Sequence, residues 1–446
     1  MRAAVLAMLL CVSAGAQKRV LYVTHSAGFR HGSIETSIRV LEQLAPGRIE
    51  VVATEDLSRI TAAGLAGFDA VFFFTSGELA LSAQQRADLL DFVRNGKGFG
   101  GAHSATDTLY NWPEYGELIG AYFDGHPWTQ EVAIDVENPD HPAMAGLPNS
   151  LRIMDEIYQH RAFSRDRVRV LMTLDTATVD LAAQGVNRTD GDFALAWVAP
   201  YGRGRVFYTA LGHFDETWLD PRIRAMLEGA LLWLTGAVEG DAAPRNAAPA
   251  LAAGSTGGFL APGTIFSLYG ADLTTGATMQ ARTFPLPRKL AGASVLVNGS
   301  PAPLLFASPP QINVQLPYGV SGAARITVRS GVKESGAENA APVAGTPFLF
   351  AVQRIGDVAV IWCTGLGDVR PPVEAGAAAP AAPLSETLLR PVVTIGGVRA
   401  EVRFSGLSPF FSGLYQVNAA IAAGLAAGVP VEVEAAGRRS NSLNLP

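Results

Sequence analysis

Cysteine is nearly absent from this chain of 446 residues, which contains only Cys11 and Cys363. Cys11 lies in an N-terminal segment that we expect to be removed, which leaves Cys363 as the only thiol. A single cysteine forms no internal disulfide, so the stability of the protein must come from its hydrophobic cores. We expect Cys363 to be a buried structural residue rather than a reactive thiol.

Histidine is missing from the second half of the chain. All seven histidines lie at or before His213. Histidine is the side chain most often used near neutral pH as a metal ligand or a proton-transfer group. Its absence excludes histidine chemistry from the C-terminal half and directs the search for a site to the N-terminal half.

The chain also lacks an excess of positive charge and a long apolar segment. Its 34 Lys and Arg against 40 Asp and Glu give a net charge of −6, which argues against a nucleic-acid partner. The apolar run at residues 3–12 is too short to span a bilayer. Arg2 precedes it and Ala14-Gly15-Ala16 resembles a cleavage site, so residues 1–16 are predicted to be a signal peptide. We therefore expect an exported protein, periplasmic, on the cell surface or extracellular, with no transmembrane segment after cleavage.

The length and composition indicate more than one packed domain. Apolar residues make up 48% of the chain and charged residues 17%, which is typical of globular structure rather than disorder. Residues 240–256 are dominated by Ala, Gly, Pro and Ser. We expect this segment to be a linker between a domain at residues 17–239 and a domain at residues 257–446.

Near-continuous apolar strands alternate with helices in the first domain. Strands are predicted at residues 19–24, 49–53, 70–74, 98–102, 168–174, 193–198 and 205–210, and helices at residues 34–44, 83–94 and 221–234. We expect Ser33 to cap the first helix and Pro221 to lie in the first turn of the last. The pattern predicts an α/β fold, a flavodoxin-like parallel sheet with helices on both faces.

Ligands of such sheets bind beyond the carboxyl ends of the strands, where three histidines are placed. His31 lies in the loop after the first strand, His103 follows a glycine-rich strand, and His213 follows the last strand. We expect His103 to be the main functional side chain, partly exposed on its loop, so that its removal costs little stability. The alternatives are a turn-capping role for His103, a solvated loop for His31, and pairing of His213 with its acidic neighbours.

Two further residues belong to an extended segment. Because alternate side chains of a strand share a face and Ile157 would point to the core, Glu156 and Tyr158 would face the cleft. A surface carboxylate is the alternative for Glu156. The candidate catalytic residues are therefore His103, His31, Glu156 and His213.

Candidate substrate-binding residues lie close to these positions. Arginine can hold an anionic or hydroxylated ligand, and a carboxylate beside aromatic rings is a common means of binding sugars. The residues are Arg30, Asp107, Tyr110, Trp112 and Tyr158. Trp112 could equally be core or lid packing. His126 and His141 each precede a proline and are expected to be turn residues, while His160 carries no interpretable motif.

Histidines and a carboxylate from separate loops could form an open site for a divalent metal. No local ligand motif is present, so metal binding would depend on the loops bringing these side chains together. The same groups without a metal would serve as an acid–base pair. The sequence does not distinguish a divalent-metal cofactor from acid–base catalysis without a cofactor.

The second domain consists of short alternating segments divided by Gly and Pro, which predicts all-β structure. It also repeats itself. Residues 295–299, 303, 308–309 and 311–313 match residues 393–397, 402, 408–409 and 416–418 in order. The repeat predicts two sandwich-like modules, at about residues 257–345 and 346–446.

With its histidines placed on strand ends, the first half resembles the ThuA-like (trehalose-utilisation) family. The matching motifs lie at residues 28–31, 54–56, 101–108, 112–116 with 123–127, 140–142, 155–158 and 204–213. That family resembles class I glutamine amidotransferases in fold, and in them a nucleophilic cysteine follows a central strand. Here the equivalent turn is Gly101-Ala102-His103-Ser104, and without a cysteine thiolate amidotransfer is excluded.

The second half resembles the Solibacter-type C-terminal domain of exported proteins. The matching residues are 261–264, 311–313, 364–367 and 413–418. No activity is assigned to that family, so this resemblance implies architecture and location, including association with the cell surface.

The ThuA resemblance implies a carbohydrate ligand and a role in sugar catabolism, on keto-glycosides or related sugars. The enzyme would be a hydrolase, lyase or isomerase that converts a glycoside or keto-sugar by acid–base or metal-assisted chemistry. Two alternatives remain, a non-catalytic sugar-binding module and a structural surface protein.

Overall fold

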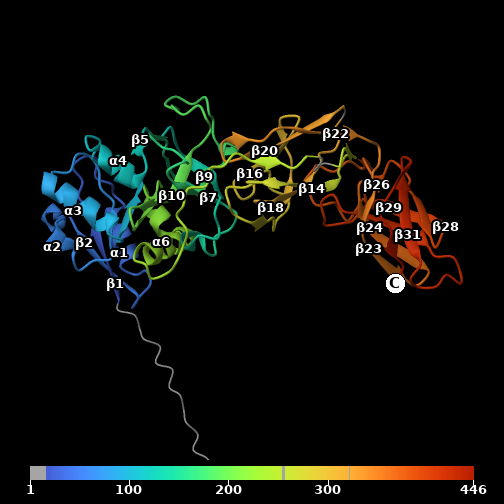
Figure 1. Cartoon of the computed structure of the whole chain (residues 1–446), viewed down its shortest axis with the longest axis horizontal. Helices are drawn as coiled ribbons and strands as arrows, with labels where there is room; N and C mark the ends of the chain where they lie inside the picture. The colour runs from blue at the N-terminus through green and yellow to red at the C-terminus, as the bar shows by residue number, and fades with distance from the viewer. Residues whose placement is uncertain (1–16, 254–256, 321) are drawn as a thin grey trace, which may run out of the picture. The chain divides into compact units, whose positions relative to one another are not determined.

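The computed structural model describes residues 17–253, 257–320 and 322–446 (Figure 1). The expected signal peptide and residues 254–256 of the expected linker lie outside these ranges. The chain divides into two compact units. Unit 1 contains the described residues up to Gln130, Asp155–Ser164 and Val198–Ala242, and unit 2 contains Glu131–Met154, Arg165–Trp197 and Ala243–Pro446.

Five parallel strands form the centre of the N-terminal sheet. They are β1 (Lys18–Val23), β2 (Ile49–Thr54), β3 (Ala70–Phe73), β4 (Gly98–Ala102) and β11 (Gly204–Thr209). Their order is β2-β1-β3-β4-β11, with parallel pairing throughout. This is the flavodoxin-like arrangement that the alternation of strands and helices predicts.

The sheet continues beyond β11 through β10, β9, β6 and β7. These strands are β10 (Ala194–Tyr201), β9 (Arg169–Leu174), β6 (Trp128–Val136) and β7 (Ser150–Ile157), and a separate small pair is β5 (Tyr122–Phe123) with β8 (His160–Arg161). Strand β6 runs antiparallel to β9. The sheet is therefore mixed, whereas the sequence predicted a parallel one without β6.

Helices lie on both faces of the sheet, as predicted. The glycines of β4 show this, because successive residues of a strand face opposite sides. A Cβ on Gly100 would meet Leu234 of α6 (Pro221–Leu234), and a Cβ on Gly101 would meet Ile119 of α4 (Pro113–Ile119). The remaining helices are α1 (Ile34–Leu41), α2 (Ala62–Leu65), α3 (Ala83–Arg94) and α5 (Asp215–Leu219).

Local signals of the sequence place some helix ends well. Helix α3 begins after a capping box made by Ser82 and Gln85, and α6 has Pro221 in its first turn, as predicted. Ser33 precedes α1 but makes no capping hydrogen bond. Its hydroxyl instead donates to the carbonyl of Gly212 at 2.8 Å, so the expected cap is replaced by a bond to a distant loop.

The C-terminal region folds into two sandwiches, as predicted. The first has sheets β12-β14-β19-β18-β15 and β13-β22-β20-β16-β17, which share one apolar core. Its strands are β12 (Ala250–Leu251), β13 (Phe259–Leu260), β14 (Ile265–Ala271), β15 (Met279–Gln280), β16 (Ala293–Val297), β17 (Ser300–Pro301), β18 (Leu304–Ser308), β19 (Gln311–Gln315), β20 (Ala324–Ser330), β21 (Lys333–Glu334) and β22 (Glu338–Pro342). Strand β12 lies within the expected linker and pairs with β14.

The second sandwich has sheets β23-β24-β30-β29-β26-β25 and β28-β27-β31-β32 around its own core. Its strands are β23 (Phe348–Ile355), β24 (Val358–Thr364), β25 (Val369–Arg370), β26 (Glu386–Thr387), β27 (Val392–Ile395), β28 (Val398–Ala400), β29 (Val402–Leu407), β30 (Tyr415–Ala420), β31 (Pro430–Ala435), β32 (Arg438–Arg439) and β33 (Leu443–Asn444).

The sequence repeat corresponds to the same hairpin in each sandwich. Strands β18 and β19 pair across a register shift after Leu304, and β29 and β30 pair across one after Val402. Each second strand carries a Gln side chain that donates to an Asn two residues later, Gln311 to Asn313 and Gln416 to Asn418. Equivalent residues thus make equivalent bonds in the two modules.

Cys363 lies in the core of the second sandwich, as expected, and burial raises the pKa of its thiol to about 12. A thiol in that state is a poor nucleophile at neutral pH. Across the described ranges, none of the helices combines the length and the apolar character needed to cross a membrane.

Candidate functional site

His103 is the residue at which the chain turns after β4. Its φ is +47°, in the left-handed region that residues other than glycine rarely adopt. The hydroxyl of Tyr208 donates to the His103 carbonyl at 2.8 Å, and the hydroxyl of Thr106 lies 2.8 Å from the same Tyr208 oxygen. Strained backbone that is held by its surroundings beside polar side chains is typical of functional sites.

The His103 side chain is fully buried, 0% exposed, which corrects the expectation of a partly exposed loop residue. Its Nδ1 lies 2.8 Å from the carbonyl of Ala210, so Nδ1 carries the hydrogen and Nε2 keeps its lone pair. The Tyr158 hydroxyl lies 2.9 Å from Nε2 and donates to it. Two hydrogen bonds therefore fix both the tautomer and the direction of the ring.

Four polar side chains from separate segments meet at Nε2 of His103. His31, His103, Glu156 and His213 each offer one ring nitrogen or carboxylate oxygen, and these atoms lie within 4.8 Å of one another. Glu156 Oε2 is 2.9 Å from His213 Nδ1 and 3.6 Å from His103 Nε2. His213 Nδ1 is 3.3 Å from His103 Nε2. The structure thus brings together all four candidate catalytic residues.

The loop that carries His213 is fixed by Asp155, a buried carboxylate beside Glu156. Its Oδ2 accepts the backbone N–H of Gly212 at 2.8 Å, and its Oδ1 accepts those of His213 and Glu156 at 3.0 and 2.9 Å. The Gly212 carbonyl accepts from Ser33 and from the indole of Trp218, both at 2.8 Å. Hydrogen bonds to the backbone of Gly212 and His213 therefore fix the position of the loop that carries His213.

The electrostatics of the cluster favour neutral imidazole at His31 and an ionised carboxylate. Burial, reinforced by the neighbouring His103 and His213, lowers the pKa of His31 to about 3. Burial alone would raise the pKa of Glu156, but the imidazoles that surround its carboxylate hold it well below its ordinary value. Metal ligands must be in these deprotonated forms.

The donor set fits a divalent metal ion. Three imidazoles and one carboxylate are the nitrogen and oxygen ligands of Zn²⁺ and related first-row ions. His103 also donates its second ring N–H to a backbone carbonyl, the outer-shell bond that metal-binding histidines usually make. Over the described ranges, this is the one group of His, Cys, Asp or Glu side chains close enough to share an ion.

The predicted substrate-binding residues make different kinds of contact in the structure. Tyr158 contacts His103 of the cluster, while Arg30 pairs with Glu55 at 2.7 Å and Glu35 at 3.4 Å. Asp107 is half-buried and accepts the Tyr110 hydroxyl at 2.6 Å.

Trp112 is only 5% exposed, and its ring stacks on Tyr115 with the Arg86 guanidinium 5.4 Å from its centroid. Trp112 therefore packs in the core, which was the alternative to stacking on a sugar.

Two residues near the cluster escaped sequence analysis. Asp155 shares with Ile157 the face of the strand that alternation turns away from the cleft, and no local pattern reveals a carboxylate that binds a distant loop. His126 was expected to be a turn residue, yet it is exposed, stacks on Phe123 and has its Nδ1 3.8 Å from Glu156 Oε1. The signal that could have found it is its place in the motif at residues 123–127.

The other two histidines do not join the cluster. His141 accepts the backbone N–H of Ala143 through Nδ1 at the start of a short helical turn, as expected of a turn residue. His160 is buried, with its Nε2 3.3 Å from the Tyr208 hydroxyl that supports the His103 turn.

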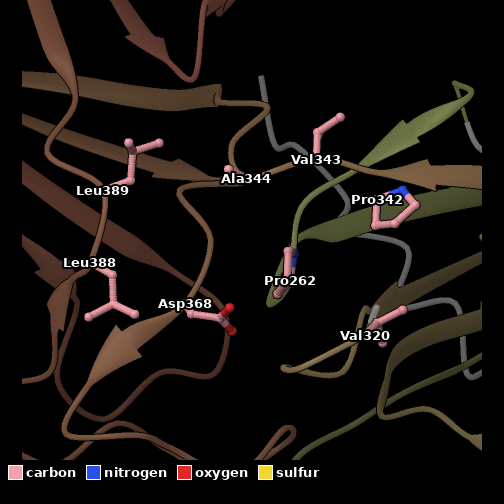
Figure 2. A pocket seen from close by; sticks show the side chains of 8 residues that line it. All are labelled: Pro262, Val320, Pro342, Val343, Ala344, Asp368, Leu388 and Leu389. Atoms are coloured by element: carbon pink, nitrogen blue, oxygen red, sulfur yellow. The ribbon is translucent and has the colours of Figure 1, made fainter. Parts of the chain in front are cut away.

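A hollow of about 300 Å³ in the C-terminal region is a second location that could be considered (Figure 2). Asp368 is the only charged residue of its lining, which otherwise consists of Pro, Val, Ala and Leu side chains, including Leu388 and Leu389. One carboxylate among apolar groups offers neither a ligand set nor an acid–base pair. The N-terminal cluster, with four such side chains, is therefore the candidate functional site.

The comparisons with known proteins concern the N-terminal half of the chain. The model of the ThuA family, described as trehalose utilisation, matches residues 19–234. A putative ThuA-like protein from Bacteroides uniformis is 23% identical, with a TM-score of 0.43 over 50% of this chain and 92% of that chain. One from Parabacteroides merdae is 20% identical, with a TM-score of 0.40 over 49% of this chain and 91% of that chain. A search of curated proteins found no match. Residues 19–234 therefore form a ThuA domain, and the chain is a sugar-utilisation-related protein.

Proposed function

We propose that the ThuA domain is an enzyme that converts a glycoside or keto-glycoside, with a divalent metal ion held by His31, His103, Glu156 and His213. The observation that carries this proposal is the meeting of these four side chains, from four separate segments, within 4.8 Å. A purely structural cluster would not need three buried or half-buried imidazoles beside an ionised carboxylate, because each polar group costs desolvation free energy.

A metal in this site would polarise a sugar carbonyl or a water molecule. The residues of the chain supply the rest. With Nε2 of His103 engaged, the Tyr158 hydroxyl loses its present acceptor and becomes a donor for a sugar oxygen. Burial raises the pKa of Tyr158 well above its ordinary value, so this hydroxyl stays protonated and acts as a hydrogen-bond donor, not as a base.

Glu156 and His213, whose Oε2 and Nδ1 lie 2.9 Å apart, would hold the metal ion in this version and are not free to accept a proton. Without a metal, a carboxylate in contact with an imidazole can accept a proton from a carbon next to a carbonyl or from a water molecule. The same contact therefore supports a metal-free acid–base version of the reaction. The requirement for a metal distinguishes the two versions.

The surroundings of the cluster favour a sugar as the ligand. Phe123 lies 4.4 Å from the Tyr158 ring and Phe214 lies 4.6 Å from the His213 ring, measured between centroids. Both rings are half-buried. Small-molecule sites combine aromatic surface with a few placed polar groups, and a sugar presents both an apolar C–H face and hydroxyls.

We also propose that the protein works outside the cytoplasm, with the two sandwiches associated with the cell surface. The predicted signal peptide and the resemblance of residues 257–446 to a domain of exported proteins support this proposal. Cell fractionation tests it, and recovery of the full chain with residues 1–16 intact from the cytoplasm would contradict it.

The experiment for the enzymatic function is turnover of a panel of glycosides and keto-glycosides by the purified full chain. The panel is measured as purified, after chelation, and after addition of Zn²⁺ or Mn²⁺. The proposal predicts turnover of at least one keto-glycoside that chelation abolishes and metal restores. Turnover unaffected by chelation would support the acid–base version, and binding without turnover would support a sugar-binding module.

A further inference from the structure

The first sandwich carries two aromatic rings and two amides on the outer face of one sheet. Tyr269 of β14 lies opposite Gln311 of β19, and Phe306 of β18 lies opposite Asn313 of β19. These side chains point away from the core, because Ile312 between the two amides belongs to it and directly opposite residues share a face. Each is at least partly exposed, and Tyr269 is 51% exposed. We call these four residues the first ring–amide face.

The second sandwich presents the same group at the equivalent positions. Trp362 of β24 lies opposite Gln416 of β30, and Phe404 of β29 lies opposite Asn418 of β30. Val417, between the two amides, belongs to the core, so these side chains also point outward. All four are partly exposed. We call them the second ring–amide face.

The amides of both faces keep hydrogen-bonding capacity that the fold does not use. In each pair the Gln Nε2 donates to the Asn Oδ1, at 2.8 Å in the first face and 3.0 Å in the second. Across the described ranges, the Nδ2 group of each Asn and the Oε1 atom of each Gln have no hydrogen-bond partner in the protein. Each face therefore offers a free donor and a free acceptor, which suits neighbouring hydroxyl groups, because a hydroxyl both donates and accepts.

The rings that flank the amides supply an apolar surface. The Phe404 ring lies over the sheet, since a Cβ on Gly406 would lie 2.8 Å from its Cζ. An apolar ring surface that stays in water gains stabilisation when a ligand covers it. Aromatic surface with a few polar groups is typical of small-molecule sites, and a sugar ring presents both a C–H face and hydroxyls. None of the eight side chains is charged, which favours a neutral ligand.

The presence of two equivalent faces in one chain indicates a ligand that itself repeats. A face of four side chains offers few contacts, so one face alone would bind weakly. Two linked faces bind a repeating chain more tightly than either does, because the second contact becomes intramolecular. A polymer of sugar rings meets both requirements.

We propose that the two ring–amide faces bind a neutral polysaccharide. One sugar ring of the polymer stacks on Tyr269 and another on Trp362, while the Gln–Asn pair of each face hydrogen-bonds to the hydroxyls. This inference goes beyond the proposed function, because it uses residues of the sandwiches alone and does not depend on the metal cluster. It gives the sandwiches a chemical means of attachment to a polymer surface.

The test is co-sedimentation of the full chain with insoluble polymers. The probes are microcrystalline cellulose, chitin and granular starch, with cross-linked polygalacturonate as an anionic polymer. We expect at least one neutral polymer to bind the unmodified protein. Tyr269→Ala or Trp362→Ala alone should raise the apparent dissociation constant about 10-fold or more, as for the loss of one of two linked contacts. The two substitutions together should abolish binding.

A second pair of substitutions acts on the amides and keeps all four rings. Asn313→Asp with Asn418→Asp retains an oxygen that accepts from the Gln side chain and replaces each Nδ2 donor with a charged oxygen. It should also weaken binding, with little change in melting temperature. Phe410→Ala is the matched control, because this ring is 69% exposed in the loop before β30 and belongs to neither face.

Several outcomes would overturn the inference. These are the absence of binding to any neutral polymer, unchanged binding in the variant that lacks both rings, an equal loss in Phe410→Ala, and tighter binding of polygalacturonate than of the neutral polymers. A dimer of the unmodified protein that dissociates in the variant lacking both rings would assign the faces to self-association instead. Turnover of small glycosides by the same variants reports on the proposed function separately, and we expect it to be unchanged.

Discussion

The buried carboxylate of Asp155 accepts the backbone N–H of His213, with 3.0 Å between Oδ1 and N. The same carboxylate accepts the N–H groups of Gly212 and Glu156. One side chain therefore fixes the backbone of two members of the cluster relative to each other. Asp155 is a positioning residue, because it acts through His213 and Glu156 rather than by contact with a substrate.

We expect Asp155→Asn to lower metal affinity about 10- to 100-fold, the usual effect of losing an outer-shell partner. The amide keeps one acceptor oxygen, but its NH₂ group would face the N–H of Gly212 and displace that loop. Metal titration and thermal melts measure the two consequences separately. Asp56→Asn is the control, because Asp56 accepts the N–H of Ser58 in an exposed turn. Unchanged metal affinity in Asp155→Asn would contradict the positioning role.

Glu156→Gln should abolish most activity with little change in folding. The substitution keeps the shape of a half-buried side chain and removes the charge that contacts His213 at 2.9 Å. We expect a fall in kcat of about 100-fold or more, as for loss of a general acid–base group. Glu50→Gln, in an exposed pair with Arg19, is the matched control. Full activity in Glu156→Gln would remove this residue from the site.

Arg165 should be essential for folding and not for chemistry. It bonds to Glu137 and Asp192 at 2.8 Å in the interior of unit 2. Arg165→Leu would remove the arginine partner of two buried carboxylates and leave Glu137 with only Lys289 and Thr173, and breaking a buried pair typically costs about 3–5 kcal/mol. Arg403→Leu, in the exposed pair with Asp357, should leave the melting temperature unchanged. Urea unfolding of both variants checks this, and equal stabilities would contradict it.

The pH dependence of stability should contain a contribution from Asp135. Burial, opposed by Lys289, raises the pKa of Asp135 to about 6, above the value of an unfolded chain. The folded state then binds more protons, so this contribution is complete below about pH 4 and is lost as the pH rises through 6.

Asp135→Asn removes this titration, and Lys289 keeps Glu137 and Thr173 as partners. The stability of the variant relative to the unmodified protein should therefore increase between pH 4 and pH 7, by on the order of 2 kcal/mol. Urea unfolding at both pH values measures it. A difference that does not depend on pH would show that Asp135 has an ordinary pKa in the folded protein.

The features that the sequence predicted well depend on neighbouring residues. The bounds of α3, β4 and α6 agree with prediction because a capping box, a run of glycines and a first-turn proline mark them locally. The meeting of His31, His103 and His213 was also predictable, because the carboxyl ends of parallel strands lie at one edge of a sheet.

The features that the sequence did not predict depend on contacts between distant segments. Ser33 bonds to Gly212 instead of capping its helix, and β12 pairs with β14 inside a segment whose composition indicates a linker. The burial of His103 and Trp112 also follows from packing that composition does not reveal. The boundaries at residues 239 and 257 remain predictions.

Metal content tests the central claim most directly. The full chain is purified without added metal, incubated with Zn²⁺, passed through a desalting column and analysed by mass spectrometry for bound metal. We predict one tightly bound divalent ion per chain, lost in the double variant His31→Ala with His213→Ala but retained in the double variant His25→Ala with His141→Ala. An ion content that is the same in both double variants, or no ion in the unmodified protein, would contradict the assignment of a metal to this cluster.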